Sequence, residues 1–113
     1  MNESLSKLKC KSCSGKTHKF TNEEIEFNLN KISDWSVNEQ KEMIFKKVSF
    51  KNFLDSLKFV NLVSKVSEEE GHHPDISFGW GYCLIMLHTH AIKGLSLNDF
   101  ILASKIDNLL KNR

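Results

Sequence analysis

Histidines are concentrated in one short part of the chain. Four of the five lie at positions 72, 73, 88 and 90. An imidazole titrates near neutral pH, so a site built from several of them can accept a proton at one atom and return it at another. Pro74 restricts the backbone of His73 toward extended geometry at the junction where the first two histidines lie. We therefore predict a proton-transfer site formed by His72, His73 and His90.

Two predicted strands bring these rings together. Residues 76–89 favour β-structure and contain a turn near position 80. In a hairpin, the start of the first strand and the end of the second lie at the same edge of the sheet. We therefore expect His72 and His73, which precede the hairpin, to lie near His90, which follows it.

A metal site is an alternative interpretation of the same residues. His88 and His90 are two apart, and residues at this spacing on a strand share a face, so both can ligate one ion with an earlier histidine as the third ligand. Carboxylates that would complete or orient such a site are few, with Asp75 and Asp99 as the candidates. We therefore expect no metal, and keep a metal enzyme as the alternative.

Two acidic positions have both a structural and a catalytic interpretation. Asp99 comes three residues after Ser96, which is the spacing of a capping box at a helix start. Glu68, Glu69 and Glu70 fall at the end of a predicted helix, where negative charge opposes the helix dipole. Both interpretations of Asp99 stay open, and one of the three glutamates is a candidate for a functional role.

Caps and hydrophobic periodicity predict three helices and four strands. Thr21 and Glu24 form a capping box, Ser49 and Ser96 can cap later helices, and Gly71 stands where the middle helix would end. The expected elements are a helix over 22–30, strands over 35–37 and 43–48, a helix over 50–70, strands over 76–79 and 82–89, and a helix after Gly94. This α-β-β-α-β-β-α order predicts an α+β fold, a four-stranded antiparallel sheet with three helices packed on one face.

Residues 1–20 differ from the rest of the chain. They hold five lysines and one glutamate, and they show no helical or strand period. Cys10 and Cys13 have the spacing of half a zinc site, with His18 as an available third ligand, but no second cysteine pair follows. We interpret this segment as a flexible basic arm joined to a single domain over 21–113, and we expect the cysteines to be reduced.

Composition excludes several functional classes. A chain of 113 residues fits one domain. Its only arginine is Arg113, whereas nucleic-acid-binding proteins use arginine to contact phosphate and guanine, so we expect no nucleic-acid partner. The sequence has no long apolar run, so we expect no membrane span and no signal peptide. We therefore expect a cytoplasmic protein. Both faces of the strand over 82–89 are largely apolar, which predicts a homo-oligomer.

Three motifs in the second half of the chain resemble those of the pterin-4a-carbinolamine dehydratase family. They are Glu68-x-x-x-His72-His73-Pro74, Thr89-His90, and Gly94-Leu95-Ser96-Leu97-Asn98-Asp99. The resemblance extends over about residues 21–110 and includes Trp35, and the Cys-x-x-Cys arm is similar to that of many bacterial members. Leu84, Met86 and His88 depart from the polar residues expected in the family, and these departures concern assembly rather than the catalytic set.

The resemblance implies an enzyme that removes water from a 4a-hydroxytetrahydropterin. The product would be the quinonoid dihydropterin, which a reductase can recycle after aromatic amino-acid hydroxylation, as for a tetrahydrobiopterin-type cofactor. The family resemblance also implies a pterin as the small-molecule substrate, no metal or organic cofactor, and a homodimer or homotetramer.

Roles for individual residues follow from the same resemblance. His72 and His90 would form the acid/base pair, and His73 would orient the pterin. Asp99 would orient a histidine or contact the substrate, and Glu68 would contact the pterin. The ring would be bordered by Pro74, Thr89, Ala91 and Ile92. An alternative function is a protein-binding module or transcriptional co-regulator, as in some animal relatives of the family that bind a homeodomain transcription factor.

Overall fold

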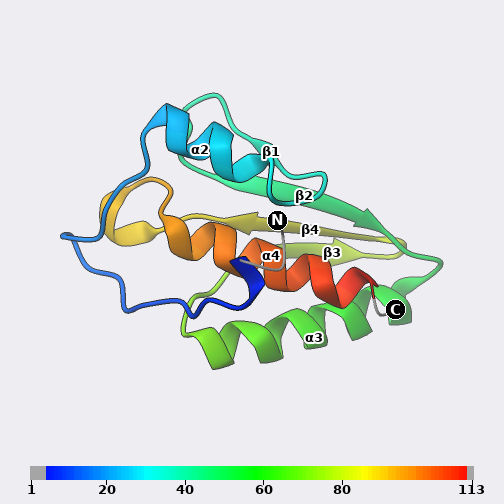
Figure 1. The fold of residues 1–113 in the computed structure, drawn as a ribbon. Coiled ribbons are helices and arrows are strands. Elements are labelled where there is room, and N and C mark those ends of the chain that lie inside the picture. The colour runs from blue at the N-terminus through cyan, green and yellow to red at the C-terminus, as the bar shows by residue number, and fades with distance from the viewer. Residues whose placement is uncertain (1–4, 112–113) are drawn as a thin grey trace.

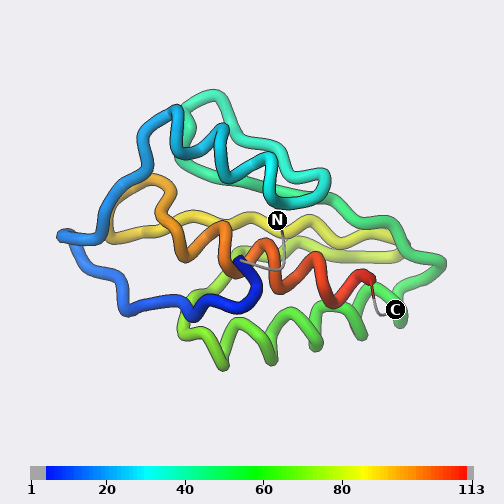
Figure 2. Tube along the Cα trace, viewed as in Figure 1, coloured from blue at the N-terminus to red at the C-terminus, as the bar shows by residue number. Residues whose placement is uncertain are grey.

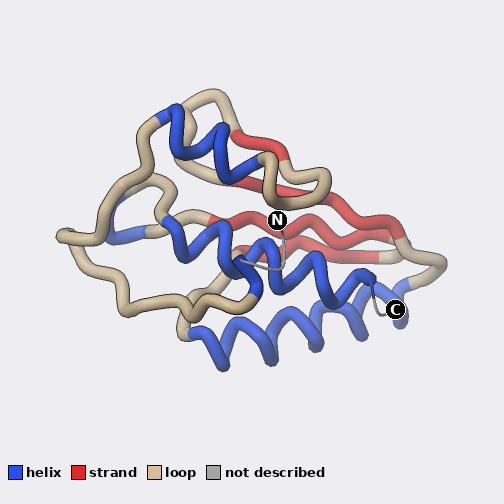
Figure 3. Tube along the Cα trace, viewed as in Figure 1, coloured by secondary structure: helices blue, strands red, loops and turns tan. Residues whose placement is uncertain are grey.

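The computed structural model describes residues 5–111, in which helices cover one face of a four-stranded antiparallel sheet (Figures 1 and 3). The strand order is β1-β2-β4-β3. The elements are α2 (Asn22–Leu29), β1 (Ser36–Val37), β2 (Ile44–Ser49), α3 (Phe53–Glu70), β3 (Asp75–Gly79), β4 (Tyr82–Leu87), the 3-10 turn η1 (His90–Ile92) and α4 (Leu97–Lys111). The predicted α+β fold and its element order are confirmed. Within the described range, no helix combines the length and the apolar character needed to cross a membrane.

Strand β4 lies in the middle of the sheet and pairs with β2 on one side and β3 on the other. Asp75 pairs with Met86 and Gly79 with Tyr82, so the β3–β4 connection is a tight hairpin. Its turn contains Gly81 at φ 84°, a left-handed conformation that glycine adopts without strain. The start of β3 and the end of β4 therefore lie at the same edge, as the sequence predicts.

The core lies between β4 and the helices. Cys83, Ile85 and Leu87 alternate along β4 and are fully buried, and they share one core cluster with Phe100 of α4 and Val63 of α3. On the other face of β4, Tyr82 is exposed and residues 84 and 86 are half-buried. The helices thus cover only one face of the central strand, and oligomerisation through the second face stays a prediction.

A buried carboxylate fastens the loop before β1 to α4. Asp107 is almost inaccessible, and it accepts hydrogen bonds from Trp35 Nε1 at 2.9 Å, from the Ser33 amide at 2.9 Å and from Lys46 Nζ at 3.0 Å. Three donors therefore converge on this one carboxylate, so it is satisfied despite its burial.

Two predicted boundaries differ from the structure by more than one residue. Ser49 does not cap α3, because it is the last residue of β2 and pairs with Tyr82. The cap is Asn52, whose side-chain oxygen accepts from the Asp55 amide at 2.8 Å. Strand β4 ends at Leu87 rather than at position 89, because Thr89 forms an isolated bridge with Gly94 and opens the turn η1.

The N-terminal segment was predicted as a flexible arm over 1–20; residues 1–4 lie outside the described range, and residues 5–20 have defined contacts. Leu5 is buried in the core cluster, and the Cys10 amide donates to Glu70 Oε1 at 2.8 Å. Asn98 forms a reciprocal pair with Lys11, donating to its carbonyl at 2.7 Å and accepting from its amide at 3.0 Å. Figure 2 shows the segment, in blue, passing the C-terminal end of α3 and the N-terminal end of α4. Polar side chains at these helix ends therefore hold a segment that has no periodicity of its own.

Candidate active site

A cleft of about 370 Å³ opens at the edge of the sheet where β3 begins and β4 ends. All four histidines of the 72–90 region line it. The lining residues are Cys13, Gly71, His72, His73, His88, Thr89, His90 and Ala91. A larger hollow of about 710 Å³ lies beside α3, but its lining contains no histidine and no cluster of titratable groups that could exchange a proton near neutral pH.

His72 and Asp99 form the buried part of the site. Gly71 ends α3 in a left-handed conformation, φ 67°, and turns the chain so that the next residue enters the interior. His72 is 7% exposed and Asp99 is inaccessible, and His72 Nε2 lies 2.7 Å from Asp99 Oδ1. A carboxylate only accepts hydrogen bonds, so Nε2 carries a proton and Nδ1 is the remaining nitrogen. The pair therefore fixes the orientation and tautomer of the His72 ring.

Asp99 is itself held by two further donors. Its Oδ2 accepts from Thr89 Oγ1 at 2.8 Å and from the Ser96 amide at 3.0 Å, and the hydroxyls of Thr89 and Ser96 lie 2.8 Å apart. The bond from Ser96 is the reciprocal half of a capping box at the start of α4. Both interpretations of Asp99 thus apply, since one oxygen stabilises the helix start and the other holds His72.

The exposed side of the cleft contains two further pairs. His73 Nε2 bonds to Glu68 Oε2 across the last turn of α3, and both side chains are more than half exposed. His88 and His90 stack with ring centroids 4.1 Å apart. Each of these three rings thus has a contacting neighbour at the rim.

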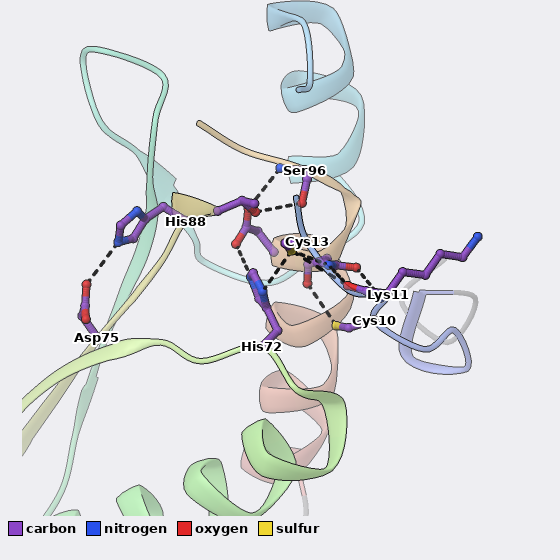
Figure 4. A network of polar contacts seen from close by, with 10 residues as sticks. Cys10, Lys11, Cys13, His72, Asp75, His88 and Ser96 are labelled. Carbon is purple, nitrogen blue, oxygen red and sulfur yellow. Dashed lines mark hydrogen bonds and ion pairs between the residues drawn. The ribbon is translucent and has the colours of Figure 1, made fainter. Parts of the chain in front are cut away.

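Cys13 brings the N-terminal segment into the site. Its Sγ lies 3.9 Å from His72 Nδ1 and accepts a hydrogen bond from Asn98 Nδ2 at 3.1 Å. Figure 4 shows the Cys13 and His72 side chains pointing toward one another. Sequence reasoning considered Cys13 only as half of a zinc site or part of a loose arm, and missed its place in the cleft.

The second cysteine of the segment anchors it. Cys10 is half-buried, and its Sγ lies 3.5 Å from the Asn98 carbonyl. Burial, reinforced by the charge of Glu70, raises the pKa of the Cys10 thiol to about 12. Glu70 also pairs with Lys105 at 3.3 Å. Burial opposes ionisation of Glu70, but the Cys10 amide and Lys105 together outweigh it and hold the Glu70 pKa below its usual 4.5.

Comparisons with known proteins place this cleft in a family. A family model described as pterin 4 alpha carbinolamine dehydratase matches residues 18–109. A protein from Halorhodospira halophila, assigned as a pterin-4-alpha-carbinolamine dehydratase, is 42% identical over 106 residues, which cover 94% of this chain and 97% of that protein. The chain belongs to this family. The pterin carbinolamine dehydratases are enzymes of the hydro-lyase class, and the predicted resemblance is confirmed.

Two solved structures resemble the chain in fold. A transcriptional coactivator/pterin dehydratase from Brucella melitensis is similar with a TM-score of 0.77 and 23% identity, over 81% of this chain and 98% of that one. A pterin dehydratase-like protein identified as a RuBisCO assembly factor in the alpha-carboxysome is similar with a TM-score of 0.58 and 27% identity, over 68% and 89% of the two chains. The fold of the dehydratase family is therefore shared by proteins whose descriptions include roles other than dehydration.

The structure brings together most of the residues predicted for a pterin site. Those that line the cleft are His72, His73, Thr89, His90 and Ala91. Asp99 lies behind His72 and Glu68 contacts His73. Pro74 and Ile92 are not among the described residues that line the cleft. His88, which the sequence suggested only as a metal ligand, lines the cleft with the others.

Proposed function

We propose that this chain dehydrates a 4a-hydroxytetrahydropterin through His72 and His90. One imidazole accepts the proton of a ring N–H while the other donates a proton to the hydroxyl at C4a. The C4a–O bond breaks, water leaves, and the electron pair of the N–H bond forms the C=N bond of the quinonoid dihydropterin. Two proton transfers balance the reaction, and imidazoles carry out both near neutral pH.

The observation that supports this proposal best is the buried His72–Asp99 pair. Asp99 holds Nε2 at 2.7 Å, which leaves Nδ1 for the cleft, where His73, His88 and His90 also lie. A histidine oriented by a buried carboxylate, in a cleft that other imidazoles also line, suits proton transfer better than substrate binding alone.

The other residues have supporting roles in the proposal. His73, held by Glu68, orients the pterin at the exposed rim, and Thr89 and Ala91 border the ring. Pro74 and Ile92 each follow a lining residue in the sequence, His73 and Ala91, and would contact the ring at the margin of the cleft. The product is the form that a reductase converts back to a tetrahydropterin, so the enzyme serves cofactor recycling. The half-buried face of β4 supports assembly as a homodimer or homotetramer.

The direct test generates the 4a-carbinolamine in a stopped-flow instrument and follows its dehydration by absorbance. Wild-type protein should accelerate the reaction, and His72→Ala and His90→Ala should each lose at least about 100-fold, the usual contribution of a positioned acid or base. His18→Ala is the matched control, since His18 also pairs with a carboxylate, Glu24, but lies outside the cleft lining. No acceleration by folded wild-type protein would overturn the proposal.

A second candidate is a protein-binding module on the same fold. The observation in its favour is the likeness to the pterin dehydratase-like protein identified as a RuBisCO assembly factor, at 27% identity. This function predicts that folded wild-type protein forms a stoichiometric complex with another protein and leaves the carbinolamine unchanged. Acceleration that depends on His72 contradicts it as the main function.

A further inference from the structure

Three possible metal ligands cluster at the rim of the cleft, outside the His72–Asp99 pair. They are Asp75 at the start of β3, His88 just after β4 and His90 at the start of η1. One ligand atom from each of the three lies within 4.8 Å of the others. The sequence-based alternative combined His88 and His90 with an earlier histidine and named Asp75 among the carboxylates that could complete the site, whereas here Asp75 itself is the third ligand of the group.

The sheet register explains why Asp75 joins the two histidines. Asp75 pairs with Met86 across the β3–β4 hairpin, and paired residues point to the same face of a sheet. His88 is two residues after Met86, and its Nε2 lies 3.1 Å from Asp75 Oδ2 (Figure 4). The carboxylate and the first imidazole are therefore adjacent on the face that the helices leave uncovered.

The two imidazoles lie side by side. Their planes are 22° apart and their centroids 4.1 Å apart, so the two rings are stacked nearly parallel to one another. His90 is exposed, Asp75 is 63% exposed at its side chain, and His88 is 29% exposed at its side chain. The cluster is thus accessible to an ion from solvent, and its exposed members can rotate.

The spacing is close to what a tetrahedral ion needs. Zinc bonds to histidine nitrogen and carboxylate oxygen measure about 2.0–2.2 Å, which places neighbouring ligand atoms about 3.3 Å apart. The Asp75–His88 separation of 3.1 Å already meets this requirement. The largest separation in the cluster, within 4.8 Å, closes by a side-chain rotation of the exposed members rather than by a backbone shift.

We propose that Asp75, His88 and His90 bind a divalent transition metal ion, with zinc as the best match. Two imidazoles and one carboxylate suit zinc, and the exposed side leaves a fourth position for water. The effect of the ion on activity rests on the proposed function: zinc inhibits the dehydratase, because it occupies the nitrogen of His90 that would carry a proton.

The test is a calorimetric titration of ZnCl₂ into the full chain, prepared without a histidine tag and reduced with a phosphine. Wild-type protein binds one ion per chain. His88→Ala and Asp75→Asn each weaken zinc binding at least tenfold. Because the two substitutions are at different positions, the test still holds if one of the variants fails to fold. His18→Ala keeps wild-type affinity, because His18 has a carboxylate partner but no second imidazole in its cluster.

Cys13→Ser separates this site from a thiol site, since Cys13 lines the same cleft. Wild-type affinity in Cys13→Ser supports the proposal. It is overturned if wild type shows no one-to-one binding, if His88→Ala binds like wild type, or if the loss appears only in Cys13→Ser. Binding is measured without substrate, so an inactive protein that binds zinc refutes only the proposed dehydratase function.

Discussion

Replacing Asp99 with asparagine reverses the polarity of one hydrogen bond in the site. Asparagine has the same shape, but one of its two terminal atoms donates instead of accepting. Two donors, Thr89 Oγ1 and the Ser96 amide, converge on Oδ2, whereas Oδ1 accepts only from His72. In Asp99→Asn, the oxygen of the new side-chain amide should therefore stay with the two donors, and its NH₂ group should face His72 Nε2.

In this arrangement His72 must accept at Nε2 and carry its proton at Nδ1. The hydrogen bonds are all retained, so the loss of stability should be about 1 kcal/mol, or about 4 °C in melting temperature. The nitrogen that faces the cleft, however, becomes a donor when the ring is neutral. In a serine-protease triad the same exchange lowers kcat by about 10⁴, and we expect a loss of at least about 100-fold here.

Asp99→Ala is the matched variant. It removes the acceptor of His72 Nε2 and of the Ser96 amide, at about 1–3 kcal/mol for each buried group, whereas the Thr89 hydroxyl can still donate to Ser96 Oγ. It should therefore unfold at a clearly lower urea concentration, while Asp99→Asn stays close to wild type. The assays are urea denaturation and stopped-flow dehydration of the carbinolamine. Full turnover in Asp99→Asn, or equal destabilisation by both variants, would refute the reasoning.

Three further predictions concern the arm and the core. Burial raises the pKa of the Cys10 thiol to about 12 and that of Cys83 to about 11, so Cys13 should react fastest of the three with an aromatic disulfide reagent. A pterin bound in the cleft should slow the reaction of Cys13. Equal rates for all three thiols would contradict this prediction. The pKa of Glu70 is lowered in the folded state, so its stabilisation is present above the usual 4.5 and is lost as pH falls through the lower folded value. Urea unfolding should therefore show a smaller acid loss in Glu70→Gln than in wild type, and identical pH profiles would exclude this role. Asp107→Ala should cost about 3–5 kcal/mol in the free energy of unfolding, because the Lys46 ammonium loses its carboxylate and keeps only the Ser33 carbonyl, and the Trp35 indole N–H loses its acceptor. A cost under about 1 kcal/mol would show that other groups replace the carboxylate.

Local signals in the sequence were sufficient for most of the fold. The Thr21–Glu24 capping box is present, because both of its bonds are made within four residues. The start of α3 was misplaced because Ser49 is a good cap by type, but its backbone is committed to Tyr82 in the sheet. Pairing between strands far apart in sequence decided between two local candidates, and Asn52 took the role.

The candidate site likewise has a part that the sequence could predict and a part that it could not. Hairpin geometry was enough to predict that His72, His73 and His90 meet, because chain reversal sets which strand ends share an edge. The contribution of Cys13 could not be predicted, since it depends on single hydrogen bonds from Asn98 to the arm. Bonds between one side chain and an irregular backbone leave no periodic pattern in the sequence.

The reciprocal pair of hydrogen bonds between Lys11 and Asn98 affects the order in which the chain folds. Its partners are 87 residues apart, so they meet only after the ribosome has made nearly all of this sequence. Contacts of such long range form late, because closing a large loop costs entropy that local contacts do not. The sheet and α3 can assemble earlier, with an open groove in place of the finished cleft. A nascent chain should therefore form its sheet and helices before Cys13 takes its place in the lining of the cleft.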